Sequence, residues 1–167
     1  MRTWIWWALP AVLAAAPAAA QEEAVSVSFG YSGLRYLESR GGHSWIGFYG
    51  SVTSHGERLG FEADAAYHRD SQKPSGIKVV LNSLTAAAGP RFVFEYGDAK
   101  PYIHVLAGLR HDRIRGQSNT AFGGMVGGGV EIPAGSDLWW RLGGDFELYF
   151  DEVENLNTLR LIAGIVF

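Results

Sequence analysis

The last eleven residues, Asn157–Phe167, read NTLRLIAGIVF and have the pattern of a complete β-strand. Apolar side chains occupy every second position from Leu159 to Phe167, whereas Thr158 and Arg160 begin the intervening set. A period of two is typical of a strand whose two faces meet different surroundings. Chain ends usually fray, so a strand that ends on an aromatic residue implies a partner strand to hold it.

Similar alternation recurs along the chain, separated by turn-forming residues. About eight segments show it: 25–36, 43–54, 58–69, 79–95, 101–112, 120–133, 138–150 and 157–167. No segment has the 3.6-residue apolar period of an amphipathic helix. An even number of antiparallel strands can close on itself and remove both sheet edges. We therefore predict an all-β, eight-stranded antiparallel up-and-down barrel in which the last strand pairs with the first.

The links between these segments suggest an orientation. The first, third, fifth and seventh links are on the whole longer than the others, as DSQKPSGIK, RIRGQSN and DEVENL illustrate against HGE and AGSD. Long extracellular loops and short periplasmic turns are typical of membrane barrels. Pro90 lacks a backbone N–H, so we expect Gly89-Pro90 to mark a bulge or bend.

The N-terminus has the pattern of a secretory signal peptide. Arg2 precedes an apolar run from Trp4 to Ala16, and Ala18–Ala20 resembles an A-x-A cleavage site. We expect residues 1–20 to be removed and residues 21–167 to form one exported domain. The formal net charge of −3 becomes −4 when Arg2 leaves, and this mild acidity argues against a nucleic-acid partner. The chain has no cysteine and hence no disulfide.

Charged residues of both signs lie on the polar face, in the middle of the predicted strands. Arginine predominates among the cations, and arginine suits confined carboxylate pairs because its planar fork binds them bidentately. The chain has only three lysines, all in or beside links. We predict an ion-pair network inside the barrel, made of Glu62, Asp64, Arg91, Arg110, Glu131, Arg141, Asp145, Glu147 and Arg160.

Aromatic residues supply a second indication of how the barrel is oriented. On the apolar face, by strand parity, we place Tyr67 and Phe150 near one end and Phe94, Trp140 and Phe167 near the other. Aromatic girdles at both ends of an apolar band are typical of transmembrane β-barrels. We therefore expect the apolar face to contact lipid and the charged face to line the interior.

With its signal peptide, alternating segments and C-terminal LRLIAGIVF, the chain resembles the small outer-membrane β-barrels of the OmpA/OmpX-like superfamily. The resemblance covers residues 21–167. It implies a bacterial outer-membrane location, buried ion pairs in the lumen, and a terminal aromatic residue, here Phe167, that the barrel-assembly machinery recognises. The links are shorter than the loops of the large adhesive members of this superfamily.

The sequence contains few motifs that indicate catalysis or ligand binding. GGMVGGG, residues 123–129, lacks the Lys-Ser/Thr of a phosphate-binding loop, and we expect Gly127 and Gly129 to make room for lumenal side chains. The five histidines have no metal-binding spacing, and DEVEN, residues 151–155, matches no calcium loop. We accordingly predict no cofactor and no catalytic or metal site. The cations Arg69, Lys73, Lys78, Arg113 and Arg115 suit either contact with lipid phosphates or loop solubility.

The expected role is structural or interactive: membrane integrity, or lipid and surface contact, by a monomer with a side-chain-filled lumen that is not an open porin. Expected partners are outer-membrane lipids, including lipopolysaccharide, and the assembly machinery. Two alternatives remain open. One is a lipid-modifying enzyme that uses His68 near the outer rim, and the other is a soluble periplasmic barrel of the lipocalin type that binds an apolar ligand.

Overall fold

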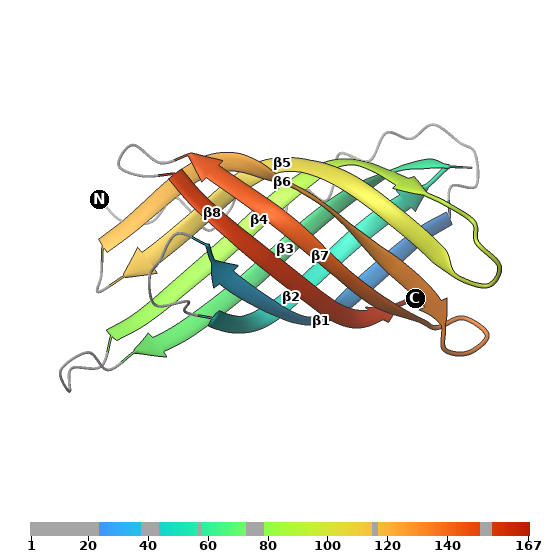
Figure 1. Cartoon of the computed structure of the whole chain (residues 1–167), viewed down its shortest axis with the longest axis horizontal. Helices are drawn as coiled ribbons and strands as arrows, with labels where there is room; N and C mark the ends of the chain where they lie inside the picture. Colours follow the sequence, from blue (N-terminus) through green and yellow to red (C-terminus); the bar gives the residue numbers. More distant parts are fainter. Residues whose placement is uncertain (1–23, 38–43, 57, 73–78, 115–116, 151–154) are drawn as a thin grey trace, which may run out of the picture.

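The chain forms a closed antiparallel barrel in which each strand pairs with its sequence neighbours (Figure 1). The computed structural model describes residues 24–37, 44–56, 58–72, 79–114, 117–150 and 155–167. Its strands are β1 (Ala24–Tyr36), β2 (Ser44–His55), β3 (Leu59–Gln72), β4 (Val79–Val93), β5 (Lys100–Ile114), β6 (Gln117–Pro133), β7 (Trp139–Phe150) and β8 (Asn155–Val166). The predicted eight-stranded fold is therefore confirmed. Within the described ranges, no helix is long and apolar enough to cross a membrane.

The closing seam joins β1 to β8, from Ser28 opposite Val166 to Tyr36 opposite Thr158. Beyond β8, Phe167 continues the ladder, because its N–H donates to the Val27 carbonyl at 2.9 Å and its carbonyl accepts from the Val27 N–H at 3.1 Å. Both the N–H and the carbonyl of Phe167 are thus hydrogen-bonded to Val27. Closure leaves no exposed sheet edge, which explains why the final segment is ordered to its end.

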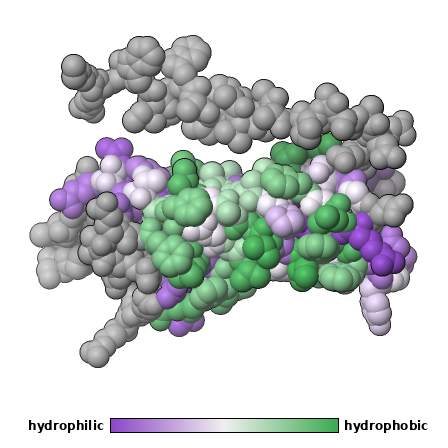
Figure 2. Space-filling model, turned by 90° about the horizontal axis from the view of Figure 1, so that it is seen from above, coloured by the Kyte–Doolittle hydropathy of each residue, from purple (hydrophilic) through white to green (hydrophobic). Residues whose placement is uncertain are grey.

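Alternation along every strand separates two surfaces. The outward side chains are large and apolar, from Val25 to Phe167, and many are about half exposed. Figure 2 shows them as a band around the middle of the visible face, with polar residues gathered toward the two ends. Strands of 12 to 17 residues exceed the ~9–11 residues that a tilted strand needs to cross a bilayer.

Two features expected from the sequence, a bulge at Gly89-Pro90 and a long RIRGQSN link, are not found. The pairing of β4 with β5 skips Gly89 and Pro90, but the register on both sides is the same and the partners in β3 are continuous. Pro90 is exposed between two buried neighbours, so it interrupts part of a ladder without a bulge. The link RIRGQSN is also shorter than expected, because β5 continues to Ile114 and β6 starts at Gln117. Link length therefore does not distinguish the two ends.

The turn between β4 and β5 has ordinary hairpin chemistry. Tyr96 and Ala99 exchange backbone hydrogen bonds of 3.1 and 3.2 Å across Gly97-Asp98. Gly97 has a φ of 61°, a left-handed conformation that glycine adopts without a steric penalty. The same end of the barrel carries the turn between β6 and β7 and the C-terminus (Figure 1).

Close packing at the seam generates a test. Gly164 faces Gly30 across the seam, and a Cβ at residue 164 would collide with the Phe29 carbonyl oxygen and lie 2.6 Å from the Tyr49 hydroxyl. We expect Gly164→Ala to lower the free energy of unfolding by about 1–3 kcal/mol through overpacking, measured by urea unfolding in detergent.

The matched control is Gly33→Ala in the same seam. A Cβ at residue 33 has nothing within 4 Å, and replacing a strand glycine removes an entropic cost. We expect unchanged or slightly greater stability for this variant. Equal losses in the two alanine variants would show that the seam is not the tight contact described.

Candidate functional site: a buried ion-pair network in the barrel interior

Charged side chains converge on the barrel axis from both halves of the sequence. The nine charged residues predicted for the lumen all have at most 4% of their surface exposed: Glu62, Asp64, Arg91, Arg110, Glu131, Arg141, Asp145, Glu147 and Arg160. They come from β3 to β8. A charge removed from water is tolerated only when it is paired and hydrogen-bonded, so the contacts among these groups decide whether the interior is stable.

Glu62 is the centre of the first group of contacts, which we call the Glu62 cluster. Its Oε1 accepts from Arg141 Nη2 at 2.5 Å, and its Oε2 lies 3.7 Å from Arg91 Nη1. Arg91 Nη2 in turn donates to Glu131 Oε1 at 2.5 Å. Both guanidiniums lie close to the Tyr102 ring, with Arg91 Cζ 4.0 Å and Arg141 Cζ 4.6 Å from its centroid, which is cation–π geometry.

Serine hydroxyls complete the coordination of Arg141. Its Nη1 donates to Ser28 Oγ at 3.0 Å and to Ser51 Oγ at 2.9 Å, and its Nε donates to the Tyr102 hydroxyl at 2.9 Å. β1 and β2 thus join the network through small polar residues. Each of the three guanidinium nitrogens of Arg141 therefore has at least one acceptor, as expected for a buried arginine.

Arg160 is the centre of the second group, the Arg160 cluster. Its Nη1 donates to Asp64 Oδ1 at 2.6 Å, and its Nε donates to Asp145 Oδ2 at 2.8 Å. Its Nε also lies 3.5 Å from Glu147 Oε1. Arg110 Nη1 lies 3.6 Å from Glu147 Oε2, which extends the cluster to a fourth strand.

Arg110 makes further contacts near the end of the barrel opposite the C-terminus. Its Nε donates to Asp112 Oδ1 at 3.1 Å, and its Nη2 donates to the Tyr36 hydroxyl. The sequence pattern places Asp112 at the end of a strand and does not predict it in the lumen. Its strand parity with Arg110 is the signal that would have placed it on the inward face.

His104 connects the two clusters. Its Nδ1 lies 3.0 Å from Glu62 Oε2, and its Nε2 lies 2.8 Å from Asp145 Oδ1. An ionised carboxylate accepts only, so two such neighbours fit a ring that carries protons on both nitrogens. The nine buried charges comprise five carboxylates and four guanidiniums, and a protonated His104 would balance them. Sequence reasoning treated this histidine as isolated, although it has the same strand parity as Arg110.

Glycines on β6 and β7 make room for these large side chains, as expected for Gly127 and Gly129. A Cβ at residue 127 would collide with the Asp145 carboxylate, and one at residue 129 would lie 2.8 Å from the Tyr102 hydroxyl. Gly143, opposite Gly129 in the next strand, borders the same hydroxyl at 2.6 Å. The glycine run therefore has a packing role.

The aromatic residues predicted for the girdles are on the outer surface. Tyr67, Phe94, Trp140, Phe150 and Phe167 are all 43–57% exposed. Phe29 stacks on Phe167 with ring centroids 5.7 Å apart, so the terminal ring contacts a side chain of the first strand.

His68 faces the interior and is fully buried. Its Nε2 lies 2.8 Å from Ser32 Oγ, a pair that the sequence pattern did not identify. Among the described residues, its Nδ1 has no hydrogen-bond partner. A Ser–His–acid triad needs a carboxylate on that nitrogen and access for substrate, and this pair offers neither.

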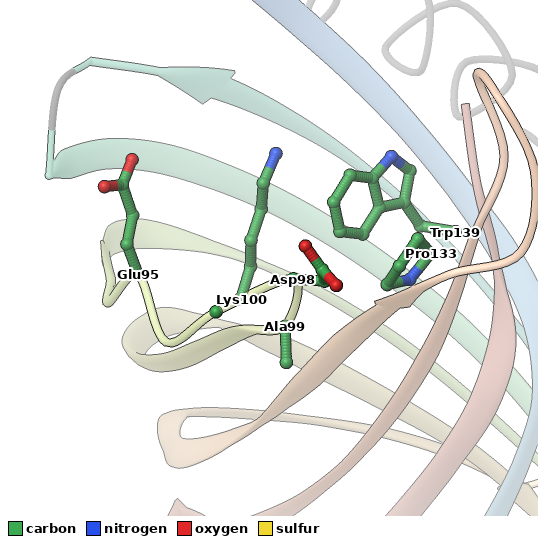
Figure 3. Close-up of a pocket in the computed structure, with 7 residues that line it drawn as sticks. Glu95, Asp98, Ala99, Lys100, Pro133 and Trp139 are labelled. Atoms are coloured by element: carbon green, nitrogen blue, oxygen red, sulfur yellow. The ribbon is translucent and has the colours of Figure 1, made fainter.

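The end of the barrel with the β4–β5 and β6–β7 turns carries a pocket, drawn in Figure 3. It is lined by Glu95, Gly97, Asp98, Ala99, Lys100, Pro133 and Trp139. Lys100 Nζ lies 4.2 Å from the centroid of the Trp139 ring, so the aromatic face already holds a cation. Within the described part of the chain, no three His, Cys, Asp or Glu residues are placed to hold a metal ion.

Stability should depend on the Arg160 cluster. We expect Arg160→Leu to lower the free energy of unfolding by about 3–5 kcal/mol, because Asp64 and Asp145 lose their nearest cation while they remain buried. Urea unfolding in detergent or lipid measures this loss, and Arg141→Leu should behave similarly through Glu62. Arg58→Leu, at the exposed β2–β3 turn, is the control and should change little. Unaltered unfolding of both lumenal variants would contradict the pairing.

Comparisons with known proteins agree with this architecture. The sequence profile of the outer membrane protein beta-barrel domain family matches residues 7–167. No protein with a curated function matches the chain significantly.

Solved structures include similar barrels at low sequence identity. Neisserial surface protein A (NspA) has a TM-score of 0.68 and 19% identity, with 85% of this chain and 95% of that chain covered. The attachment invasion locus protein Ail of Yersinia pestis has a TM-score of 0.60 and 20% identity, covering 88% and 100%. OprG from Pseudomonas aeruginosa has a TM-score of 0.60 and 10% identity, covering 86% and 95%.

An apolar exterior around a charged interior is the reverse of a soluble calyx, which needs an apolar cavity and a polar exterior. The lipocalin alternative is therefore wrong. With the family match over nearly the whole sequence, these features lead to one conclusion: the chain belongs to the outer membrane protein beta-barrel domain family and resides in the bacterial outer membrane.

Proposed function

We propose that this protein is a monomeric, closed outer-membrane barrel with a structural and surface-contact role, and that it is neither a general porin nor an enzyme. The observation that carries the proposal is the continuous chain of contacts Arg141–Glu62–His104–Asp145–Arg160 across the interior. Eight strands enclose a lumen that side chains can fill, and these five side chains are all buried. Ions would have to break buried pairs in order to pass.

The proposed partners follow from the surface. The half-exposed apolar band fits the acyl chains of outer-membrane lipids, including lipopolysaccharide. Phe167, at the end of the strand that closes the barrel, is proposed as the residue that the assembly machinery recognises. Recognition from the periplasm would place the start of β1, the C-terminus and the β2–β3, β4–β5 and β6–β7 turns on the periplasmic side. Residues 1–23 lie outside the described residues, so the signal peptide stays a prediction.

Conductance tests the closed lumen. Reconstituted into planar bilayers, the refolded protein should show no stable conductance steps comparable with those of a sixteen-stranded porin, because charged side chains block the axis. A trimeric general porin in the same bilayers is the positive control. Porin-sized steps from pure, correctly folded protein would contradict the proposal, and recovery of the native protein in the soluble periplasmic extract would do so too.

Assembly tests the role of Phe167. Phe167→Ala keeps the backbone bonds to Val27 but removes the ring, so we expect less protein in the outer-membrane fraction while refolding in detergent is retained. Phe29→Ala is the matched control because it abolishes the same ring stack, worth about 0.5–1.5 kcal/mol, without altering the terminal residue. If the two variants reach the outer membrane equally, Phe167 contributes only packing.

A further inference from the structure

Three polar residues form a row on the outer wall at the end of the barrel opposite the C-terminus. In the strand register, Arg69 of β3 is opposite Asn82 of β4, and Asn82 is opposite Arg113 of β5. The two arginines are exposed, and Asn82 is half-buried between them. Neighbouring strands lie ~4.8 Å apart, so the row spans roughly 10 Å. We call it the Arg69–Asn82–Arg113 row.

This row borders the apolar band. Two residues closer to the middle of the barrel, Tyr67 is opposite Leu84, and both side chains are over 40% exposed on the same outer face. A strand rises ~3.3 Å per residue, so the row is only two such steps from the apolar Tyr67–Leu84 pair. Its guanidiniums are therefore within reach of the boundary between acyl chains and headgroups. Long arginine side chains readily extend from an apolar surface to a polar interface.

The row is oriented to donate. The Tyr67 hydroxyl donates to Asn82 Oδ1 at 2.8 Å, which occupies the amide oxygen and leaves the NH₂ group for another acceptor. Among the described residues, neither Arg69 nor Arg113 forms a salt bridge. Asp112, adjacent to Arg113 in sequence, faces the interior and bonds to Arg110.

We propose that the Arg69–Asn82–Arg113 row binds a phosphate group of lipopolysaccharide lipid A, whose acyl chains lie on the apolar wall beneath it. This inference deepens the proposed function and rests on its membrane orientation. Two guanidiniums on either side of an amide supply fork-shaped, charge-assisted donors, the chemistry that phosphate recognition uses. Among the residues that the structure describes, no acidic side chain pairs with either arginine on this face, and a bound phosphate would relieve the repulsion between the two guanidiniums.

The experiment compares lipid A with and without its phosphates. Folded mature protein in a zwitterionic detergent is titrated with purified bisphosphorylated lipid A, and bound lipid is counted by native mass spectrometry. We expect Arg69→Gln/Arg113→Gln to weaken binding by about tenfold or more, since charge-assisted bonds to phosphate are lost. Dephosphorylated lipid A should bind the unmodified protein and this variant equally weakly.

Arg35→Gln/Arg58→Gln is the matched control, because it removes two exposed arginines from outside the row. It should bind bisphosphorylated lipid A as the unmodified protein does. Tyr67→Phe removes only the hydroxyl that orients Asn82, and it should weaken binding to a smaller degree while the barrel keeps its fold.

Several outcomes would overturn the inference. These are equal affinity in the Arg69→Gln/Arg113→Gln and control variants, equal affinity for the two forms of lipid A, or complete displacement by inorganic phosphate at the same concentration as the lipid. The last result would indicate a site for free phosphate. A protein that fails to bind lipid A but stays in the outer membrane and does not conduct would refute this site alone and leave the proposed function standing.

Discussion

The pairing of charges inside a narrow cylinder is the constraint on which the rest of the structure depends. Four buried guanidiniums and five buried carboxylates have left water, and each would be costly if it stood alone. Arg160 meets Asp64 and Asp145, and Glu62 meets Arg141. Asp145 and Arg160 are already opposite each other in the β7–β8 hairpin, but the Arg160–Asp64 and Arg141–Glu62 pairs join β8 and β7 to β3, strands that are not neighbours in the sheet. These two pairs form only when the barrel has closed. The network therefore favours the closed state over partly formed sheets.

Lipid acts as the second constraint, from outside. A hydrocarbon surrounding cannot satisfy backbone N–H and C=O groups, so a membrane-spanning sheet must close on itself. The seam between β1 and β8 achieves this closure and extends to Phe167. The packing inside and the lipid outside thus act on alternate residues of the same strands. At the seam, Gly164 lies so close to the backbone of β1 that a Cβ would collide with the Phe29 carbonyl oxygen.

A consequence for function is that the interior and the rim have different roles. The Glu62 and Arg160 clusters, linked through His104, use their polar groups on one another, which suits stability and closure. At the rim, Arg69 and Arg113 have no such partners among the described residues and can interact with molecules outside the barrel.

Sequence by itself determined the fold, the inward and outward faces, and the nine charged residues of the interior. It could do so because side chains alternate with a period of two along a strand, and because arginine and aromatic residues are costly on the wrong face. It misjudged two features that depend on neighbouring strands: Pro90 fits without a bulge, and β5 and β6 extend into the expected link between them.

Only the tertiary structure decided which charges pair, that His104 bridges Glu62 and Asp145, and that Ser32 meets His68. Strand stagger sets these contacts, and stagger is a property of paired strands that no single strand encodes. For the same reason, the alignment of Arg69, Asn82 and Arg113 on three adjacent strands became visible only in the register of the closed sheet.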